Sequence, residues 1–352
     1  MRYLLTGLVA TVCLLADDSG RTLTIDHYVP SGQSQIYVRE LVQARTVLRG
    51  NAPLTDRVVL FVHGAGTPAE VAFDVPFTDY SWMAYLAAAG FDVFAMDMTG
   101  YGRSTRPAAM NDPCNVAKAP CAATYPKNLT TIASDWNDID AVVNHLRSLR
   151  RVDRVNLIGW SLGAPRAGGY TLQHPDTVAK LVLLAPAYNR SSPVNPPQSG
   201  PAEGAAMTTQ NHEEFLANWD RQTGCPNQYD KLTAEAVWAS MLASDPVGAT
   251  WGTGVRRAPQ VTVWGWNQAS VAKVQVPALL IAGDNDKQVS PERVKELFAD
   301  LGSSKKVFAS LGCSSHNAMW ERNHLLLFRA SLEWITNTTV NGVSAGSVRL
   351  GE

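Results

Sequence analysis

The chain has 352 residues, 45% of them hydrophobic, and a formal net charge of −1 at pH 7. This length is enough to bury a large core in one α/β domain or in two ordinary domains. The charge is balanced and no dense Lys/Arg block occurs, which argues against nucleic acid or an anionic membrane surface as a main partner.

The first 16 residues resemble a secretory signal peptide, because Arg2 precedes an apolar stretch that ends at Ala16. That stretch is shorter than the roughly 20 apolar residues that a spanning helix needs, so no transmembrane segment is expected. We therefore expect a secreted or periplasmic protein, with a cytoplasmic location as the alternative.

The elements predicted from residue patterns start with two strands and then alternate between strand and helix. Residues 26–31 and 35–42 are rich in β-branched and aromatic side chains and predict antiparallel strands. Further strands, each a short continuous apolar run, are expected within 57–66, 91–104, 155–160, 179–187, 277–286 and 305–311. Helices are expected within 80–90, 131–149, 164–175, 290–301 and 325–335. This alternation predicts an α/β fold with a mostly parallel central sheet and helices on both faces.

Two stretches interrupt the pattern. Residues 105–130 contain four prolines and two cysteines and are expected to form an irregular insertion. Residues 187–274, rich in Pro, Gln, Asn and Trp, follow the sixth strand and are interpreted as a lid over the carboxyl edge of the sheet, where such folds bind ligands. The core would then comprise residues 22–186 and 275–352.

Four cysteines remain when Cys13 of the leader is set aside, and an even number suits two disulfides in an exported protein. We favour Cys114–Cys121, which would close a short loop in the first insertion. Cys225–Cys313 would then tie the lid to the loop after the last strand of the core. Four free thiols are the alternative.

The sequence Gly159-Trp160-Ser161-Leu162-Gly163 follows a predicted buried strand and precedes a predicted helix. In this context a G-x-S-x-G sequence predicts a nucleophile on a strained turn, with glycines where side chains would collide with the turn. An ordinary structural turn is the alternative. A serine nucleophile needs a base that an acid orients, and His316 and Asp286 (or Asp284) follow later strands.

The chain resembles the α/β-hydrolase superfamily from about residue 22 to 336, through HGAG, DMTGYGRS, GWSLG, GDND and SHNAMWE in that order. The resemblance favours Asp286 over Asp284 as the acid and matches His316 to the histidine before the final helix. The motif predicts the backbone N–H of Leu162 as one donor to an oxyanion. The resemblance gives Ala65 N–H as the second, with an ordinary strand-end turn as the alternative for HGAG.

The predicted activity is hydrolysis of a carboxylic ester through an acyl-enzyme, with no cofactor and no metal. Trp160, Trp264 and Trp266 are expected to line a pocket for an apolar or aromatic small-molecule substrate, although the lid tryptophans could instead form a small core of their own. Amidase or peptidase, lactonase, thioesterase and C–C bond hydrolase activities share the same three residues and remain open. A non-catalytic, hydrolase-like binding protein is the alternative of another class.

Overall fold

The structure is a computed structural model that describes residues 21–47, 54–196 and 199–352. The predicted signal peptide, residues 1–16, lies outside the described residues. None of the described helices is both long enough and apolar enough to cross a lipid bilayer.

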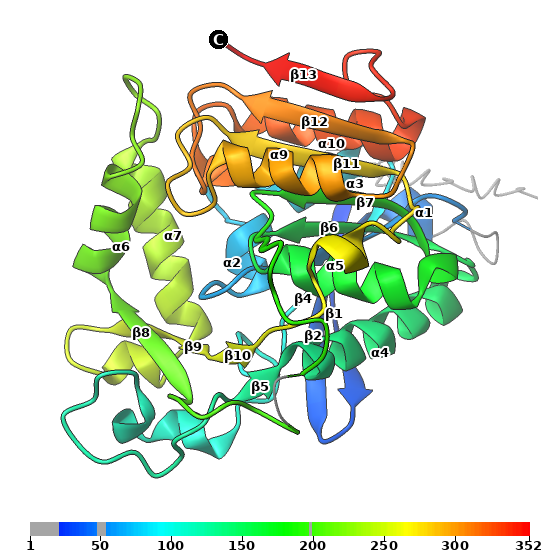
Figure 1. Cartoon of the computed structure of the whole chain (residues 1–352). Helices are drawn as coiled ribbons and strands as arrows, with labels where there is room; N and C mark the ends of the chain where they lie inside the picture. The colour runs from blue at the N-terminus through cyan, green and yellow to red at the C-terminus, as the bar shows by residue number, and fades with distance from the viewer. Residues whose placement is uncertain (1–20, 48–53, 197–198) are drawn as a thin grey trace, which may run out of the picture.

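A sheet of nine strands in the order β1-β2-β4-β3-β6-β7-β11-β12-β13 forms the centre of the molecule (Figure 1). Its strands are β1 (Thr22–Ser31), β2 (Ser34–Gln43), β3 (Val58–Val62), β4 (Asp92–Met96), β6 (Val155–Trp160), β7 (Val178–Leu184), β11 (Ala278–Gly283), β12 (Lys306–Leu311) and β13 (Gly346–Leu350). The pairs β1–β2 and β2–β4 are antiparallel, and every other pair is parallel. The predicted fold class is confirmed.

Helices cover both faces of this sheet because its central strands are apolar on both sides. In β3, Val59 and Phe61 point to one face and Leu60 to the other, and all five residues of the strand are buried. One face packs against α2 (Ala69–Phe73), α3 (Trp82–Ala88) and α10 (His324–Asn337). The opposite face packs against α4 (Ile132–Arg150), α5 (Gly163–Gln173) and α9 (Pro291–Asp300).

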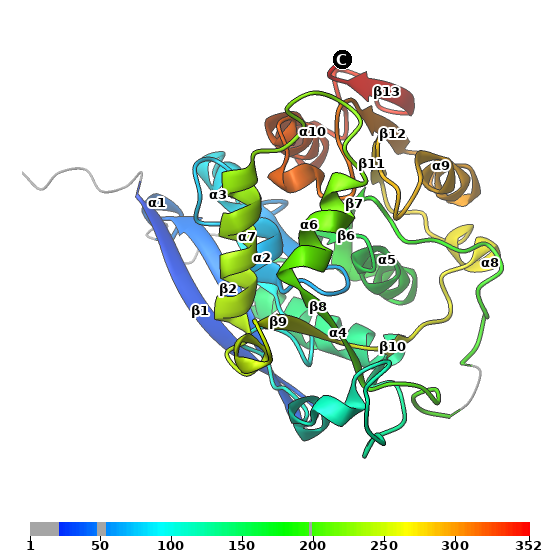
Figure 2. The ribbon, with the colours of Figure 1, turned by 90° about the vertical axis from the view of Figure 1, so that its left-hand side faces the viewer.

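The segment between β7 and β11 leaves the sheet and returns to it. It contains β8 (Met207–Asn211), α6 (His212–Asp220), α7 (Lys231–Ser244), β9 (Val255–Pro259), β10 (Val261–Thr262) and α8 (Gln268–Val271). β8 and β9 form an antiparallel pair, and β10 pairs with β5 (Thr130–Thr131) from the end of the first insertion. Both views place α6, α7 and the β8–β9 pair beside the edge of the sheet at which β6 and β12 end (Figures 1 and 2).

Both predicted cysteine pairs are disulfides in the structure. The Cα atoms are 5.2 Å apart in Cys114–Cys121 and 5.7 Å apart in Cys225–Cys313. The two bonds span 7 and 88 residues of sequence. In the chain-entropy model the long loop contributes about 4–5 kcal/mol to stability and the short loop about 2–2.5 kcal/mol. The second disulfide fastens the segment after α6 to the loop that carries His316.

One element of the sheet was missing from the sequence-based prediction. The chain after α10 turns back and adds β13 as a parallel edge strand beside β12. Four of its five residues are exposed or half-buried, so the strand lacks the apolar run by which the other strands were recognised.

Candidate active site

Ser161 lies on the turn between β6 and α5 with a φ of 56°, a left-handed conformation that costs energy for a residue with a side chain. Three backbone hydrogen bonds hold the turn. The N–H of Ser161 donates to Leu184 O at 2.9 Å, and Ser161 O accepts from the N–H groups of Ala164 and Ala187. The serine is therefore fixed by β7 and by the start of α5.

The neighbouring glycines are required by contacts that a Cβ atom would violate. A Cβ on Gly159 would lie 2.7 Å from Gly163 O, and one on Gly163 would lie 2.3 Å from Val62 O. A Cβ on Gly64, in the loop after β3, would lie 2.9 Å from Ser161 Cβ. Both glycines of the G-x-S-x-G sequence thus permit the sharp turn, and Gly64 lets the loop after β3 approach the serine.

His316 and Asp286 come from the loops after β12 and β11 and are joined by a hydrogen bond. His316 Nδ1 lies 2.8 Å from Asp286 Oδ2. The other carboxylate oxygen, Oδ1, accepts from the N–H groups of Gln288 and Val289, each at 2.8 Å. Both side chains are buried, with 4% of His316 and 2% of Asp286 exposed. This arrangement leaves the Nε2 atom of His316 available to exchange a proton.

The alternative acid, Asp284, faces elsewhere. Its Oδ2 atom lies 2.7 Å from Arg349 Nη1 on β13, at the edge of the sheet. Of the two carboxylates that the sequence offered, the structure joins Asp286 to the histidine.

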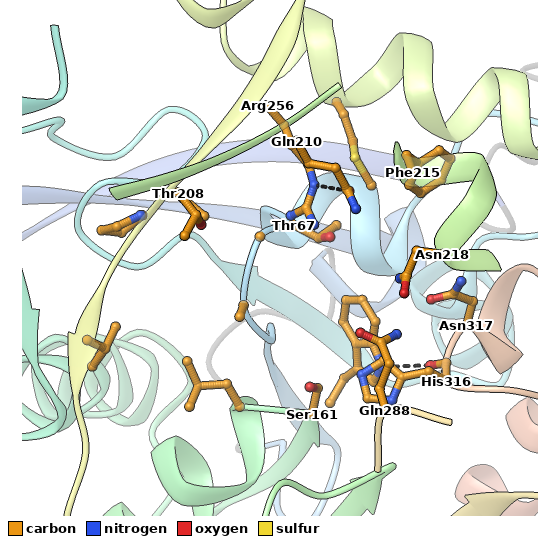
Figure 3. Close-up of a pocket in the computed structure, with 18 of the residues that line it drawn as sticks. Thr67, Ser161, Thr208, Gln210, Phe215, Asn218, Arg256, Gln288, His316 and Asn317 are labelled. Carbon is orange, nitrogen blue, oxygen red and sulfur yellow. Dashed lines mark hydrogen bonds between the residues drawn. The ribbon is translucent and has the colours of Figure 1, made fainter. Parts of the chain in front are cut away.

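A cavity of about 270 Å³ opens beside Ser161 (Figure 3). Ser161, His316, Leu162 and Ala65 all line it, so the serine, the base and both candidate oxyanion donors share one space. Apolar walls come from Trp160, Phe215, Met241 and Trp320, and polar ones from Gln210, Asn218, Arg256, Gln288 and Asn317. Several of these side chains belong to β8, α6, α7 and β9.

Only one of the three tryptophans predicted for the pocket lines this cavity. Trp160 does, and its indole Nε1 also donates to His316 O at 2.9 Å. Trp266 packs on Gly168 of α5, where a Cβ would meet the indole ring at 2.2 Å, and Trp264 packs edge-on against Trp136 of α4. These two side chains anchor the returning chain to the core, so the pocket prediction is wrong for them.

A buried carboxylate connects the His316 loop to the inserted segment. Glu321 accepts from the backbone N–H and the hydroxyl of Ser315, and from Trp219 Nε1 and Gln228 Nε2. Burial raises the pKa of Glu321, while these donors favour its charged form. Glu321 is the last residue of SHNAMWE, but the sequence alone assigns it no role, because a glutamate five residues after a histidine has no distinctive spacing.

His63, at the start of the HGAG loop, has a structural role. Its Nδ1 lies 2.7 Å from Gly64 O, and its Nε2 accepts from Met98 N–H at 3.0 Å. Burial, aided by the nearby Arg166 cation, lowers the pKa of His63 well below its usual range. The neutral ring thus links the loops after β3 and β4 through its hydrogen bonds.

The lowered pKa of His63 predicts that the protein loses stability in acid. The unfolded chain binds a proton at His63 near pH 6.5, whereas the folded chain does so only at lower pH. The stability that the neutral ring contributes is therefore present above about pH 6.5 and is lost progressively below it. We expect His63 to contribute up to about 1.4 kcal/mol per pH unit to that decline. Urea unfolding at several pH values gives the free energy of unfolding. As the pH falls, this free energy should decline less steeply in His63→Gln than in His174→Gln, a control in the turn after α5. Identical declines would contradict this role.

The fold and this arrangement define the class of protein, the α/β-hydrolase superfamily of serine hydrolases. Residues 54–323 match the family described as serine aminopeptidase, S33, and the chain belongs to that family. A curated relative from Pseudomonas putida, named 2-hydroxy-6-oxononadienedioate/2-hydroxy-6-oxononatrienedioate hydrolase 2, is 26% identical over 290 residues, 75% of this chain and 82% of the relative.

Solved structures show the same fold at low sequence identity. A serine hydrolase involved in carbazole degradation superposes with a TM-score of 0.57 at 17% identity, covering 89% of this chain and 99% of that one. An esterase from Exiguobacterium antarcticum gives a TM-score of 0.55 at 15% identity, covering 89% and 100%. The 2-hydroxy-6-oxo-6-phenylhexa-2,4-dienoate hydrolase from Rhodococcus sp. strain RHA1 gives 0.56 at 16%, covering 90% and 99%.

Proposed function

We propose that the protein hydrolyses carboxylic esters through an acyl-enzyme formed on Ser161. One observation carries the proposal: Ser161, in a left-handed turn, lines the same cavity as His316, whose Nδ1 is hydrogen-bonded to the buried Asp286. A serine hydroxyl is a weak nucleophile that needs a base held in one orientation, and this pair supplies that base.

In the proposed reaction His316 Nε2 takes the hydroxyl proton as Ser161 Oγ attacks the ester carbonyl. The carbonyl oxygen becomes an oxyanion and accepts from the N–H groups of Leu162 and Ala65, where one donor of this kind is worth about 3–4 kcal/mol. His316 then protonates the departing alcohol. Water then attacks the acyl carbon and loses a proton to the same nitrogen. The bond from the acyl carbon to Ser161 Oγ breaks, His316 returns the proton to Oγ, and the acid departs, while Asp286 holds the ring and balances its charge.

A second candidate is hydrolysis of a C–C bond next to a ketone, in which the same serine would attack the carbonyl. It is favoured by the name of the Pseudomonas putida relative, a hydrolase of 2-hydroxy-6-oxononadienedioate. Amides and lactones are further candidate substrates for the same three residues. A purely binding protein is disfavoured, because serine, histidine and aspartate are all present.

We also propose that residues 187–274 act as a lid and that the protein is exported. Side chains from β8, α6, α7 and β9 complete the cavity beside Ser161, which is what a substrate-covering segment would do. Two disulfides suit an oxidising compartment.

The experiment that separates these candidates is a panel of matched acyl compounds. Initial rates are measured for an ester, an amide, a lactone, a thioester and 2-hydroxy-6-oxononadienedioate, each against Ser161→Ala as the blank. We expect the ester to give the highest kcat/KM. Faster turnover of the ketone than of any ester would replace the proposal by the second candidate.

A paired substitution tests the choice of acid. Asp286→Asn should lower ester kcat/KM by about 10³–10⁴-fold, because an asparagine at this place favours the wrong imidazole tautomer. Asp284→Asn should change it less than about 3-fold, since Asp284 pairs with Arg349. Steady-state kinetics on purified variants would give both values. The assignment would be reversed if Asp284→Asn were the more damaging change.

A further inference from the structure

Arg256 places a cation on the wall of the cavity beside the HGAG loop. It lies on β9 opposite Gln210 of β8, and both side chains line the cavity with Ser161 (Figure 3). The guanidinium packs directly on Gly66, where a Cβ atom would fall 1.5 Å from Nη1 and 2.4 Å from Cζ. Gly66 directly follows Ala65, the proposed oxyanion donor. The guanidinium therefore packs against the neighbour of that donor.

The guanidinium has little to neutralise it. Its Nε donates to Gln210 Oε1 at 2.7 Å, and no carboxylate among the described residues lies within ion-pair distance. The nearby Glu214 accepts from the N–H of Asn211 at 2.9 Å in the cap of α6. Removal of the cation from water lowers the pKa of Arg256 to about 10.

Two fully buried arginines show what this chain does with a structural cation, whereas Arg256 is half-buried. Arg257, the next residue, donates to both carboxylate oxygens of Asp245 at 2.9 and 2.6 Å. Arg166 pairs with Asp135 at 2.7 Å and also donates to two backbone carbonyls. Removal of an arginine side chain from water without a carboxylate partner costs free energy, unless a bound ligand supplies the negative charge.

The rest of the cavity is also suited to an anion. Of the described residues that line it, none is acidic. The side chains of Asn218, Gln288 and Asn317 bring amide groups to the side near His316 (Figure 3). A guanidinium offers paired N–H donors that match the two oxygens of a carboxylate.

We propose that Arg256 binds a carboxylate of the substrate, so that the preferred ester is an anionic one that carries a free carboxylate besides its scissile bond. This inference rests on the proposed function, since it assigns the substrate class of the same cavity. The carboxylate can belong to the acyl part or to the alcohol part of the ester, and the substrates below separate the two.

Two matched pairs of esters test the proposal. On the acyl side, the para-nitrophenyl monoester of glutaric acid is compared with para-nitrophenyl pentanoate, which has a methyl group in place of the carboxylate. On the alcohol side, meta-carboxyphenyl butyrate is compared with its neutral methyl ester. The readout is the ratio of kcat/KM between the charged and the neutral member of each pair.

We expect the wild-type protein to prefer the charged member of one pair, and Arg256→Met to lower that ratio by about 10–100-fold. Arg256→Lys should give an intermediate ratio, because it keeps the charge and loses the paired donors. The control Arg329→Met removes an exposed arginine on α10 that pairs with Glu333, and it should keep the wild-type ratio. An equal ratio in wild type and Arg256→Met for both pairs would overturn the proposal.

A binding measurement separates this inference from the proposed reaction. Ser161→Ala is titrated with the intact glutarate monoester by calorimetry, with and without Arg256→Met. At least about tenfold weaker binding in the double variant supports the carboxylate site, even if the wild type cleaved no ester. Equal affinities would refute the site and leave ester hydrolysis untouched.

Discussion

Ser161→Ala is expected to lower kcat/KM for the best ester by about 10⁴-fold or more. In the proposed reaction the hydroxyl oxygen of Ser161 forms the acyl-enzyme, and an alanine at this position has no oxygen to acylate. The residual rate would come from the oxyanion donors and from binding alone. Stopped-flow or steady-state assays with a chromogenic ester would measure the loss.

Ser344→Ala is the matched control for this change, because Ser344 is an exposed serine in the turn before β13, remote in sequence from the cavity residues. It should retain activity within about twofold, as surface substitutions usually do. Retention of most activity by Ser161→Ala itself would show that the nucleophile is another group.

His316→Ala is expected to cost as much as the loss of the serine, about 10⁴-fold or more in kcat/KM. In the proposed reaction the two groups act as a unit, so the hydroxyl is not activated once the imidazole is gone. The double variant Ser161→Ala/His316→Ala should therefore be little worse than either single variant. The measurement is kcat/KM for the three variants on one ester.

The control here is His174→Ala, which removes a ring stacked on Tyr170 at the end of α5. Its kcat/KM should stay within about twofold of the wild type. If the losses of the two single variants simply multiplied in the double variant, serine and histidine would be acting independently, against the account.

Much of the fold followed from local sequence patterns. The glycines at 159 and 163, directly after a continuous apolar run, predicted a strained turn, and the structure shows the collisions that forbid larger residues there. The edge strand β13 was not predicted. It is polar, and its pairing with β12 depends on the path of the chain after α10.

The walls of the cavity could not be predicted in the same way. Trp264 and Trp266 looked like pocket residues because of their type, yet which side of an irregular segment faces the core is decided by tertiary packing. Here Gly168 and Trp136 receive these side chains. Arg256 and Arg257 are neighbours in sequence, and only the alternation of side chains along β9 sends one to the cavity and the other to Asp245.

The most direct test of the central claim is to label the protein with a fluorophosphonate and locate the adduct by peptide mass spectrometry. Such a reagent phosphonylates a serine that an adjacent base has activated. The account predicts one adduct, on the peptide that contains Ser161, and none in His316→Ala. An adduct on another residue, or ester turnover that survives complete labelling of Ser161, would contradict it.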